Sequence, residues 1–276
     1  MSLRLDHIVI AVHDLERARA DYTALGFTVL EGGSHPGRAT HNALVVFEDG
    51  VYFELIAWHE PVPQQRWWQH LQQHGEGIVD VALLPHDVAS VVAQAGARGV
   101  PYQGPNDGGR LRPDGQRLQW QTAHPDRPDL PFLCGDISPR VLRVPDGAAR
   151  IHANGATGVA SLSIAVQDVP ASLARWRALL GPQAVSTEST TLAGQGQRAA
   201  FIALGGSTLA LLGPRVSAAA PSGDAQLQSL ARRGEGPYAL TLTTQDQART
   251  GQVAPLAQTH GAWIEFDSLH SVRAAA

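Results

Sequence analysis

The sequence has 276 residues, 43% of them hydrophobic and 17% charged, which predicts one large or two ordinary globular domains and excludes a disordered chain. The formal net charge of −4 provides no basic surface for a polyanion, so we expect no nucleic-acid partner. No apolar run approaches the length of a membrane span, and the first residues carry no apolar signal core. With Cys134 as the single cysteine, a cytoplasmic protein without a membrane partner is expected.

Every basic residue is an arginine, because the sequence contains no lysine. This excludes a Schiff-base lysine, a pyridoxal anchor, the lysine of a P-loop and a Ser-Lys dyad. The glycine pattern of a dinucleotide site and the nucleophile elbow of the α/β-hydrolases are also missing. Several large classes of enzyme are therefore ruled out before any candidate site is considered.

A unit made of a short apolar strand, an aspartate and a helix recurs four times along the chain. The aspartates are Asp14, Asp87, Asp168 and Asp246, with spacings of 73, 81 and 78 residues. Each aspartate is a predicted N-cap, because its carboxylate accepts the free amides of the first helical turn. The fourth copy shows the pattern more weakly than the other three.

The first unit predicts the order strand, helix and three strands. Alternation in the opening stretch places five side chains on one strand face, namely Leu3, Leu5, His7, Val9 and Ala11. After Asp14, apolar residues recur at helical spacing until Gly26. Residues 27–31, 42–48 and 51–58 then read as strands, and the Asp49-Gly50 pair between the last two predicts a hairpin.

The later units follow the same order. In the second, a helix ending near Gly99 precedes a strand, a turn at Asp114-Gly115 and the strands 117–124 and 130–136. The third has a hairpin from 198–206 and 207–214, and the fourth keeps only 262–268 after its helix, so it is shorter. Residues 139–157 read as a link between the halves 1–140 and 156–276, and residues 215–226 as a surface loop.

This organisation resembles the vicinal-oxygen-chelate superfamily, and more closely its glyoxalase-like domain proteins. The resemblance rests on LDHIVIAVHDLERA, on ATHNALVVFEDGVYFELIA and on LRPDGQRLQWQ, which cover residues 3 to about 137. It implies an α+β fold in which four βαβββ modules pair into two curled mixed sheets, as in barrels of the glyoxalase and bleomycin-resistance type. It also implies a divalent metal ion in a cup, held by the first and last strands of each module.

Carried onto this sequence, the resemblance places His7 and Glu54 at the ligand positions of the first module. Seven residues before the capping aspartates lie His7, Asp80, Ser161 and Ala239. Asp80 is thus the second module's candidate ligand, and the second half offers only Glu265 as a candidate carboxylate. A metal site, if present, is expected in the first half, with zinc, nickel, manganese, iron or magnesium all open.

Each of these residues also has a simpler interpretation. His7 lines the wall through one hydrogen bond, and Glu54 is then a pocket acid or an ion-pair partner. Asp80 requires a metal, an arginine partner or exposure, because burying an unpaired carboxylate is costly. Since only one histidine is placed, two histidines and a carboxylate are not available for iron, and extradiol dioxygenase chemistry is disfavoured.

Five further residues are candidates for the wall of the substrate pocket: Asn42, Tyr52, Arg112, Trp120 and His124. Arg112 suits a substrate carboxylate through its planar guanidinium, although a solvated arginine beside a turn is the commoner case. Trp67 and Trp68 are either a lid over the cup or packing residues. Cys134 is expected to be an ordinary buried thiol.

Two functions follow for the small-molecule ligand that the resemblance implies. In the first, the protein is a metal-dependent lyase, isomerase or hydrolase for a small oxygen-rich metabolite, with His7 and Glu54 on the ion and a carboxylate such as Glu54 moving the proton. In the second, it is a metal-free module that sequesters a small molecule, and His7 only lines the wall. The second half is then a structural or dimerising partner, and a homodimer stays open.

Overall fold

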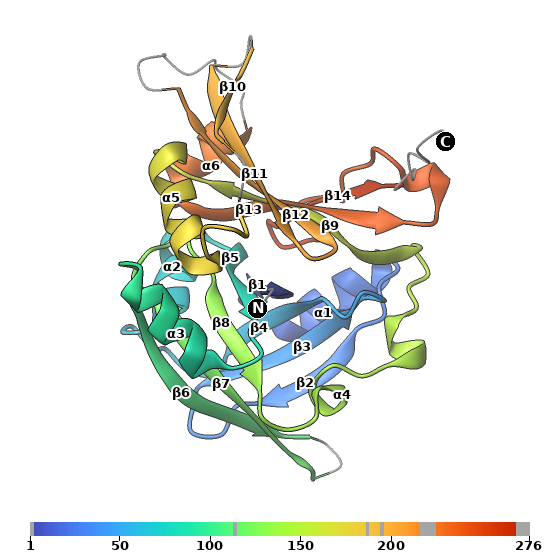
Figure 1. Cartoon of the computed structure of the whole chain (residues 1–276). Coiled ribbons are helices and arrows are strands. Elements are labelled where there is room, and N and C mark those ends of the chain that lie inside the picture. Colours follow the sequence, from blue (N-terminus) through green and yellow to red (C-terminus); the bar gives the residue numbers. More distant parts are fainter. Residues whose placement is uncertain (1–2, 113–114, 186–187, 194–195, 216–224, 269–276) are drawn as a thin grey trace, which may run out of the picture.

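Two curled β-sheets with helices between them make up the computed structural model shown in Figure 1. The structure describes residues 3–112, 115–185, 188–193, 196–215 and 225–268. Asp114 of the predicted turn and most of the predicted loop 215–226 lie outside these residues. Among the described helices, none has the length and apolar character needed to cross a membrane.

The first sheet has eight strands in the order β2-β3-β4-β1-β5-β8-β7-β6. Its strands are β1 (Arg4–Ala11), β2 (Leu30–Ser34), β3 (Thr40–Val46), β4 (Tyr52–Trp58), β5 (Gly77–Leu84), β6 (Tyr102–Leu111), β7 (Arg117–Pro125) and β8 (Phe132–Asp136). In each module the first strand pairs in parallel with the last, and the antiparallel β1–β5 pair joins the two modules. The predicted pairing of two βαβββ modules into one curled sheet is confirmed.

The second sheet has six strands in the order β10-β11-β12-β9-β13-β14. They are β9 (Ala156–Ala165), β10 (Thr190–Leu192), β11 (Gln197–Leu204), β12 (Ser207–Pro214), β13 (Gly236–Thr244) and β14 (Trp263–Asp267). The third module is complete, whereas the described part of the fourth contributes only β13 and β14. Within the described residues, the fourth module therefore has two strands fewer than the third.

The capping aspartates start three α-helices as predicted. Asp14, Asp87 and Asp168 each accept a backbone amide three residues later, at 3.0, 2.8 and 3.0 Å. These helices are α1 (Leu15–Ala24), α3 (Val88–Ala97) and α5 (Val169–Leu180), and α2 (Arg66–His74) and α6 (Ala225–Arg233) lie outside the pattern.

The predicted fourth helix is wrong. Asp246 caps only a single 3-10 turn, η2 (Gln247–Arg249), by accepting the amide of Ala248. Gly251 follows almost at once with a φ of 78°, and Pro255 comes soon after, so an α-helix finds no run of residues on which to continue.

The predicted alternation along β1 is wrong in its first half. Leu3 and Leu5 belong to the large hydrophobic core together with Ile8, whereas Val9 and Ala11 belong to a smaller cluster under the cup. The cause is an irregularity in the β1–β5 register between Leu5 and His7, which shifts the side-chain phase. The strand therefore sends Leu5 into the core and His7 into the cup.

One large hydrophobic core joins the two halves, because it contains buried residues of both sheets. Helices α1, α3 and α5 lie in this region between the sheets (Figure 1), which leaves the concave face of the first sheet turned away from the second. The segment that reads as a link forms α4 (Arg140–Arg143) and the 3-10 helix η1 (Gly147–Arg150). Val144, directly after α4, packs in a small cluster with Leu44 and Tyr52 at the rim of the cup.

Candidate active site

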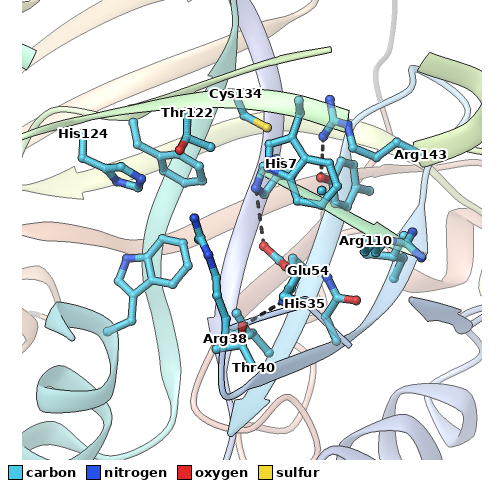
Figure 2. Close-up of a pocket in the computed structure, with 18 of the residues that line it drawn as sticks. His7, His35, Arg38, Thr40, Glu54, Arg110, Thr122, His124, Cys134 and Arg143 are labelled. Atoms are coloured by element: carbon cyan, nitrogen blue, oxygen red, sulfur yellow. Dashed lines mark hydrogen bonds and ion pairs between the residues drawn. The ribbon is translucent and has the colours of Figure 1, made fainter. Parts of the chain in front are cut away.

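The first sheet encloses a cavity of about 310 Å³, and Figure 2 shows the side chains that line it. Its floor is apolar, because Ile56, Phe132 and Cys134 belong to a buried cluster with partly buried Trp67 and Trp120. The polar lining comprises His7, His35, Arg38, Asn42, Glu54, Arg66, Arg110, His124 and Arg143. Titratable groups of both signs thus meet on an apolar floor, which is typical of a small-molecule site.

His7 enters the cavity from β1 with its ring fixed on both sides. The ring stacks on Tyr52 with centroids 4.6 Å apart, and Nδ1 lies 2.7 Å from Asp6 Oδ2. An ionised carboxylate only accepts hydrogen bonds, so Nδ1 is the protonated nitrogen and donates to Asp6. In the neutral ring Nε2 then carries its lone pair into the cavity, which is the state that a metal or a proton requires.

Glu54 on β4 faces His7 across this gap. Its Oε2 lies 3.5 Å from His7 Nε2, and its Oε1 accepts a 2.6 Å hydrogen bond from Asn42 Nδ2. Oδ1 of Asn42 lies against Gly32, where a Cβ atom would overlap it, so glycine is required there. The structure therefore brings three of the sequence candidates, His7, Glu54 and Asn42, into one group.

A second histidine completes this group, and the sequence did not indicate it. His35 follows β2, and its Nε2 lies 3.9 Å from Glu54 Oε1 while Nδ1 is 2.8 Å from Thr40 Oγ1. Burial lowers the pKa of His35, although the charge of Glu54 opposes that change, so the ring is neutral at pH 7. Two imidazoles thus flank one carboxylate, so the expectation that two histidines and a carboxylate are not available is wrong.

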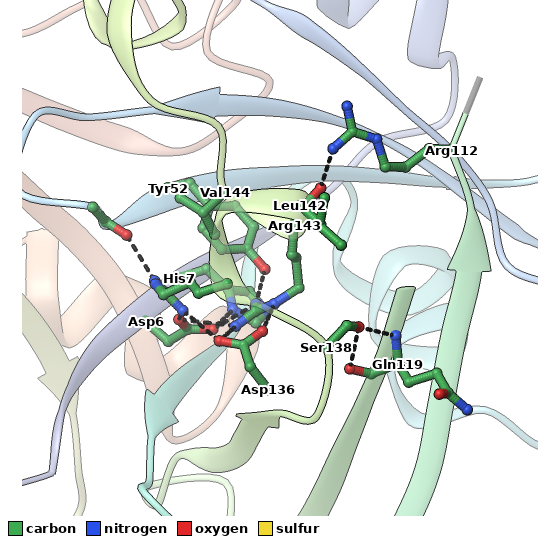
Figure 3. A network of polar contacts seen from close by, with 12 residues as sticks. Asp6, His7, Tyr52, Arg112, Gln119, Asp136, Ser138, Leu142, Arg143 and Val144 are labelled. Atoms are coloured by element: carbon green, nitrogen blue, oxygen red, sulfur yellow. Dashed lines mark hydrogen bonds and ion pairs between the residues drawn. The ribbon is translucent and has the colours of Figure 1, made fainter. Parts of the chain in front are cut away.

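Behind His7, two arginines of α4 hold Asp6 in a buried ionic network (Figure 3). Arg143 Nη1 donates to Asp6 Oδ2 at 2.9 Å and to the Tyr52 hydroxyl at 2.6 Å, and Arg140 Nη1 donates to Asp6 Oδ1 at 2.5 Å. Asp136 accepts from both arginines, at 2.5 Å from Arg143 Nε and 3.1 Å from Arg140 Nη1. The predicted link therefore supplies part of the wall of the cup.

The ionisation of Asp6 is fixed by this network. Burial by itself raises the pKa of Asp6, but Arg143, the hydrogen bond from His7 and Arg140 together outweigh it and hold the pKa well below its ordinary value. Burial lowers and Asp6 raises the pKa of Arg143, which ends well above its ordinary value. Asp6 is consequently an anion at neutral pH, and it orients the His7 ring.

Asp80 takes the arginine partner that was one of its three expected outcomes. Its Oδ2 accepts hydrogen bonds from Arg66 and, at 2.8 Å, from Trp67 Nε1, and its Oδ1 accepts the amide of Val81 at 2.9 Å. Asp80 is buried but is not among the residues that line the cavity. Its role in the described structure is to fasten Arg66 and Trp67 of α2 to the rim.

The remaining candidates separate into those on the wall and one outside it. Tyr52, Trp120 and His124 line the cavity, and His124 stacks on Phe132 with ring centroids 5.0 Å apart. Arg112 does not line the cavity, because it follows the last residue of β6, Leu111. Its guanidinium Nη1 donates instead to the Leu142 carbonyl at 3.0 Å.

The floor also contains the thiol of Cys134. Burial raises the pKa of Cys134 to about 12, so the thiol is protonated at neutral pH. Asp6, His7 and Cys134 each place a ligand atom within 4.8 Å of the others. Among the described residues, they form a group of three whose ligand atoms could hold a metal ion. Asp6 is already bound by two arginines, so this group is a poorer cation site than the one around Glu54.

Strand register defines the ligand positions of the second module. Val9 pairs with Glu54 across β1 and β4, and Ala82 pairs with Phe132 across β5 and β8. Since Asp80 corresponds to His7, Phe132 corresponds to Glu54. The second module therefore offers a phenyl ring where the first offers a carboxylate.

Several functional residues escaped the sequence pattern. His35, Arg38 and Arg110 lie in a glycine-rich loop and near the end of a long strand, where neither helical nor strand periodicity marks a side chain as inward. Asp6 did carry a signal, since a charged residue directly before His7 in a buried strand requires a partner. Its partners lie more than 130 residues later in the chain, at Arg140 and Arg143.

Comparison with known proteins follows the same lines. A family model described as a glyoxalase-like domain matches residues 5–180, more than half of the chain. The structure is similar to that of a hypothetical protein from Staphylococcus aureus, with a TM-score of 0.71 and 14% identity over 98% of this chain and 100% of the other. No curated protein sequence matches the chain.

Two enzymes with related structures are also similar. One is a mutant of 4-hydroxymandelate synthase from Streptomyces coelicolor, with a TM-score of 0.59 and 15% identity over 93% of this chain and 78% of that one. The other is a fusion of a xylose isomerase-like TIM barrel and 4-hydroxyphenylpyruvate dioxygenase, with a TM-score of 0.55 and 15% identity over 90% of this chain and 37% of that one. At such identities these structural similarities establish the fold alone, whereas the match to the family model establishes the family. The chain belongs to the glyoxalase-like domain family.

Proposed function

We propose that this protein is a divalent-metal-dependent lyase, isomerase or hydrolase for a small oxygen-rich metabolite, with His7 and Glu54 as ligands of the ion. The observation that carries the proposal is the 3.5 Å distance between His7 Nε2 and Glu54 Oε2. That distance is too long for a normal hydrogen bond. Two ligand atoms that each lie about 2.1 Å from one ion, at a tetrahedral angle, are separated by about 3.4 Å.

The donor set around this point fits such an ion. His35 supplies a second imidazole beside the carboxylate, and Asp6 holds the outer nitrogen of His7 as metal-binding histidines require. Two nitrogens and one carboxylate suit zinc, nickel, manganese or iron better than magnesium, which prefers oxygen alone. In this proposal Asp80 is an anchor for α2 and not a ligand, because its oxygens are already bound.

The residues of the cup divide the work. A metal ion held there supplies a Lewis acid for a carbonyl or enolate oxygen. Glu54 accepts and returns the substrate proton, because Asn42 keeps its carboxylate oriented inside the cavity. Tyr52, Trp120 and His124 form the wall against which the substrate lies, and the apolar floor excludes water from it.

Elemental analysis of protein purified without an affinity tag tests the metal site. We expect about one equivalent of transition metal per chain, and little in the His7→Ala and Glu54→Gln variants, since a site with two or three protein ligands fails without one of them. His41→Ala is the matched control, because His41 lies on the neighbouring strand β3 and stacks on His59 outside the cavity lining. It is expected to retain the metal.

A metal-free binding module is the second candidate, and one observation favours it. Phe132 occupies the register position at which the second module would supply a carboxylate, so the frame of four strand ligands is incomplete. If the wild-type protein contains no metal and His7→Ala leaves ligand binding unchanged, the enzyme proposal is wrong and the cup is a binding site.

A further inference from the structure

The charges that line the cavity do not balance. Four arginines line it, Arg38, Arg66, Arg110 and Arg143, against a single carboxylate, Glu54. Two of the four are neutralised from behind the wall, because Arg66 pairs with Asp80 and Arg143 pairs with Asp6 and Asp136. The other two leave positive charge in the cavity.

Among the described residues, Arg110 is a buried cation that makes no ion pair. Its side chain lies on β6, the residue is only 6% exposed, and its Nη1 donates to the backbone carbonyl of Gly32. Within the part of the chain that the structure describes, no carboxylate approaches its guanidinium within 4.0 Å. A neutral carbonyl does not offset the cost of removing a guanidinium from water, whereas an anion in the cavity would.

Arg38 reaches the same cavity from another segment of the chain. It lies on the exposed loop between β2 and β3, and Figure 2 shows its side chain reaching into the cavity beside His35. Both guanidinium groups act on the His35 ring, since each lowers its pKa. No ion pair of Arg38 is found among the described residues, so its donors are available to a ligand.

Another part of the wall has a different character. Trp67, Trp120, Ile56 and Phe132 line the cavity on the side of the apolar floor, and they offer flat or branched hydrocarbon surfaces. A ligand that satisfies both walls has a charged end for the arginines and an apolar body for this surface.

We infer that the cup selects small organic carboxylates, with Arg110 and Arg38 as the carboxylate-binding residues and the tryptophan-lined wall holding an apolar body. The inference deepens the proposed function by giving the substrate class of the same cavity. It does not depend on the ion, because both arginine side chains line the cavity in the protein alone. A guanidinium presents paired donors that match the two oxygens of a carboxylate. A ligand with an amide of the same shape offers only one oxygen acceptor and no charge.

Calorimetry with a matched pair of probes tests the inference on full-length protein freed of metal with EDTA. Phenylacetate is expected to bind the wild type at least about tenfold more tightly than phenylacetamide, because a charge-assisted pair is stronger than a neutral hydrogen bond. In Arg110→Met this preference is expected to fall below about threefold, and in Arg38→Met to fall in part. Arg110→Lys keeps the charge and is expected to retain some of the preference.

Arg112→Gln is the control, because Arg112 is two residues from Arg110 but lies outside the cavity lining. It is expected to keep the full preference for the acid. Arg38 is exposed, so Arg38→Met is expected to fold and decides the matter if Arg110→Met does not.

The outcomes separate this inference from the metal proposal. Acid preference without metal, reduced by either arginine variant, supports the inference whether or not an ion is found in the protein. A preference that appears only after metal is restored, and that both arginine variants retain, shows that the ion holds the anion and overturns it. Equal binding of acid and amide by the wild type overturns it as well.

Discussion

The two sheets start from the same repeated module, yet among the described residues only the first brings a histidine and a carboxylate together at these positions. Register aligns Ser161 with His7 and Ala210 with Glu54, since Ser163 pairs with Ala210 as Val9 pairs with Glu54. In the fourth module Ala239 takes the histidine position, and Glu265 alone retains a carboxylate. The module therefore conveys a scaffold, and the chemistry depends on a few positions within it.

The difference extends to how each cup is closed. Leu44 and Phe201 occupy equivalent positions opposite Glu54 and Ala210. Leu44 is 3% exposed because α4 and Val144 cover it, whereas Phe201 is 48% exposed. The first sheet has eight strands and a covering helix, while the described part of the second has six strands. A complete second module and a covering segment are thus what turn a curled sheet into a closed cavity.

We expect the largest loss of stability when the ionic network around Asp6 is broken. The second sheet has no such aspartate, because Ala160 occupies the equivalent position there. Asp6→Ala leaves Arg143 buried with one of its two carboxylate partners removed. We expect the free energy of unfolding to fall by about 3–5 kcal/mol, as measured by urea denaturation. Asp146→Ala is the control, because Asp146 is mostly exposed in its pair with Arg150 and should cost no more than about 1 kcal/mol.

The same network predicts a dependence on pH. Because the pKa of Asp6 is lower in the folded state than in the unfolded chain, its contribution to stability is complete above the unfolded value of about 3.9 and is lost as the pH falls below it. The difference in unfolding free energy between the wild type and Asp6→Asn should therefore shrink as the pH falls from about 4 to about 2, because Asp6 takes up a proton in the unfolded chain over that range. A constant difference over that range would show that Asp6 is not ionised in the folded protein.

A smaller effect is expected on metal binding when the two carboxylates at equivalent positions, Glu54 and Glu265, are replaced. Glu54→Gln is expected to weaken metal binding by at least about tenfold, whereas Glu265→Gln should leave it unchanged, because Ser161 and Ala239 supply no second ligand near Glu265. Equilibrium dialysis against zinc or manganese measures both variants. Equal losses in the two variants would place a metal site in each half and remove the proposed contrast.

The smallest effect concerns the open face of the second sheet. Phe201→Ala should change the free energy of unfolding by less than about 1 kcal/mol, because nearly half of the side chain is already exposed. Leu44→Ala, its buried counterpart, should cost about 2 kcal/mol or more. A large loss in Phe201→Ala would indicate that another surface covers this face in solution, and the mass of the particle in light scattering would then identify a homodimer.

Local patterns predicted much of this molecule because they encode short-range physics. Aspartate caps, hairpin turns and strand alternation depend on neighbouring residues, so the repeat of modules and three of its helices could be found in advance. The exceptions are also local in cause. A register irregularity turns Leu3 and Leu5 to the core face of β1, and Gly251 ends the fourth helix after a single turn.

The sequence by itself determined the module, its recurrence and the placing of His7 and Glu54 on the first and last strands of the first module, which are neighbours in the sheet. Only the tertiary structure decided that Asp80 is bound by Arg66, that Arg110 and not Arg112 lines the cavity, and that His35 and Arg143 join it from a loop and a link. The reason is that sheet curvature and long-range ion pairs bring these residues together. Such contacts leave no period in the sequence, since each depends on partners tens to more than a hundred residues away.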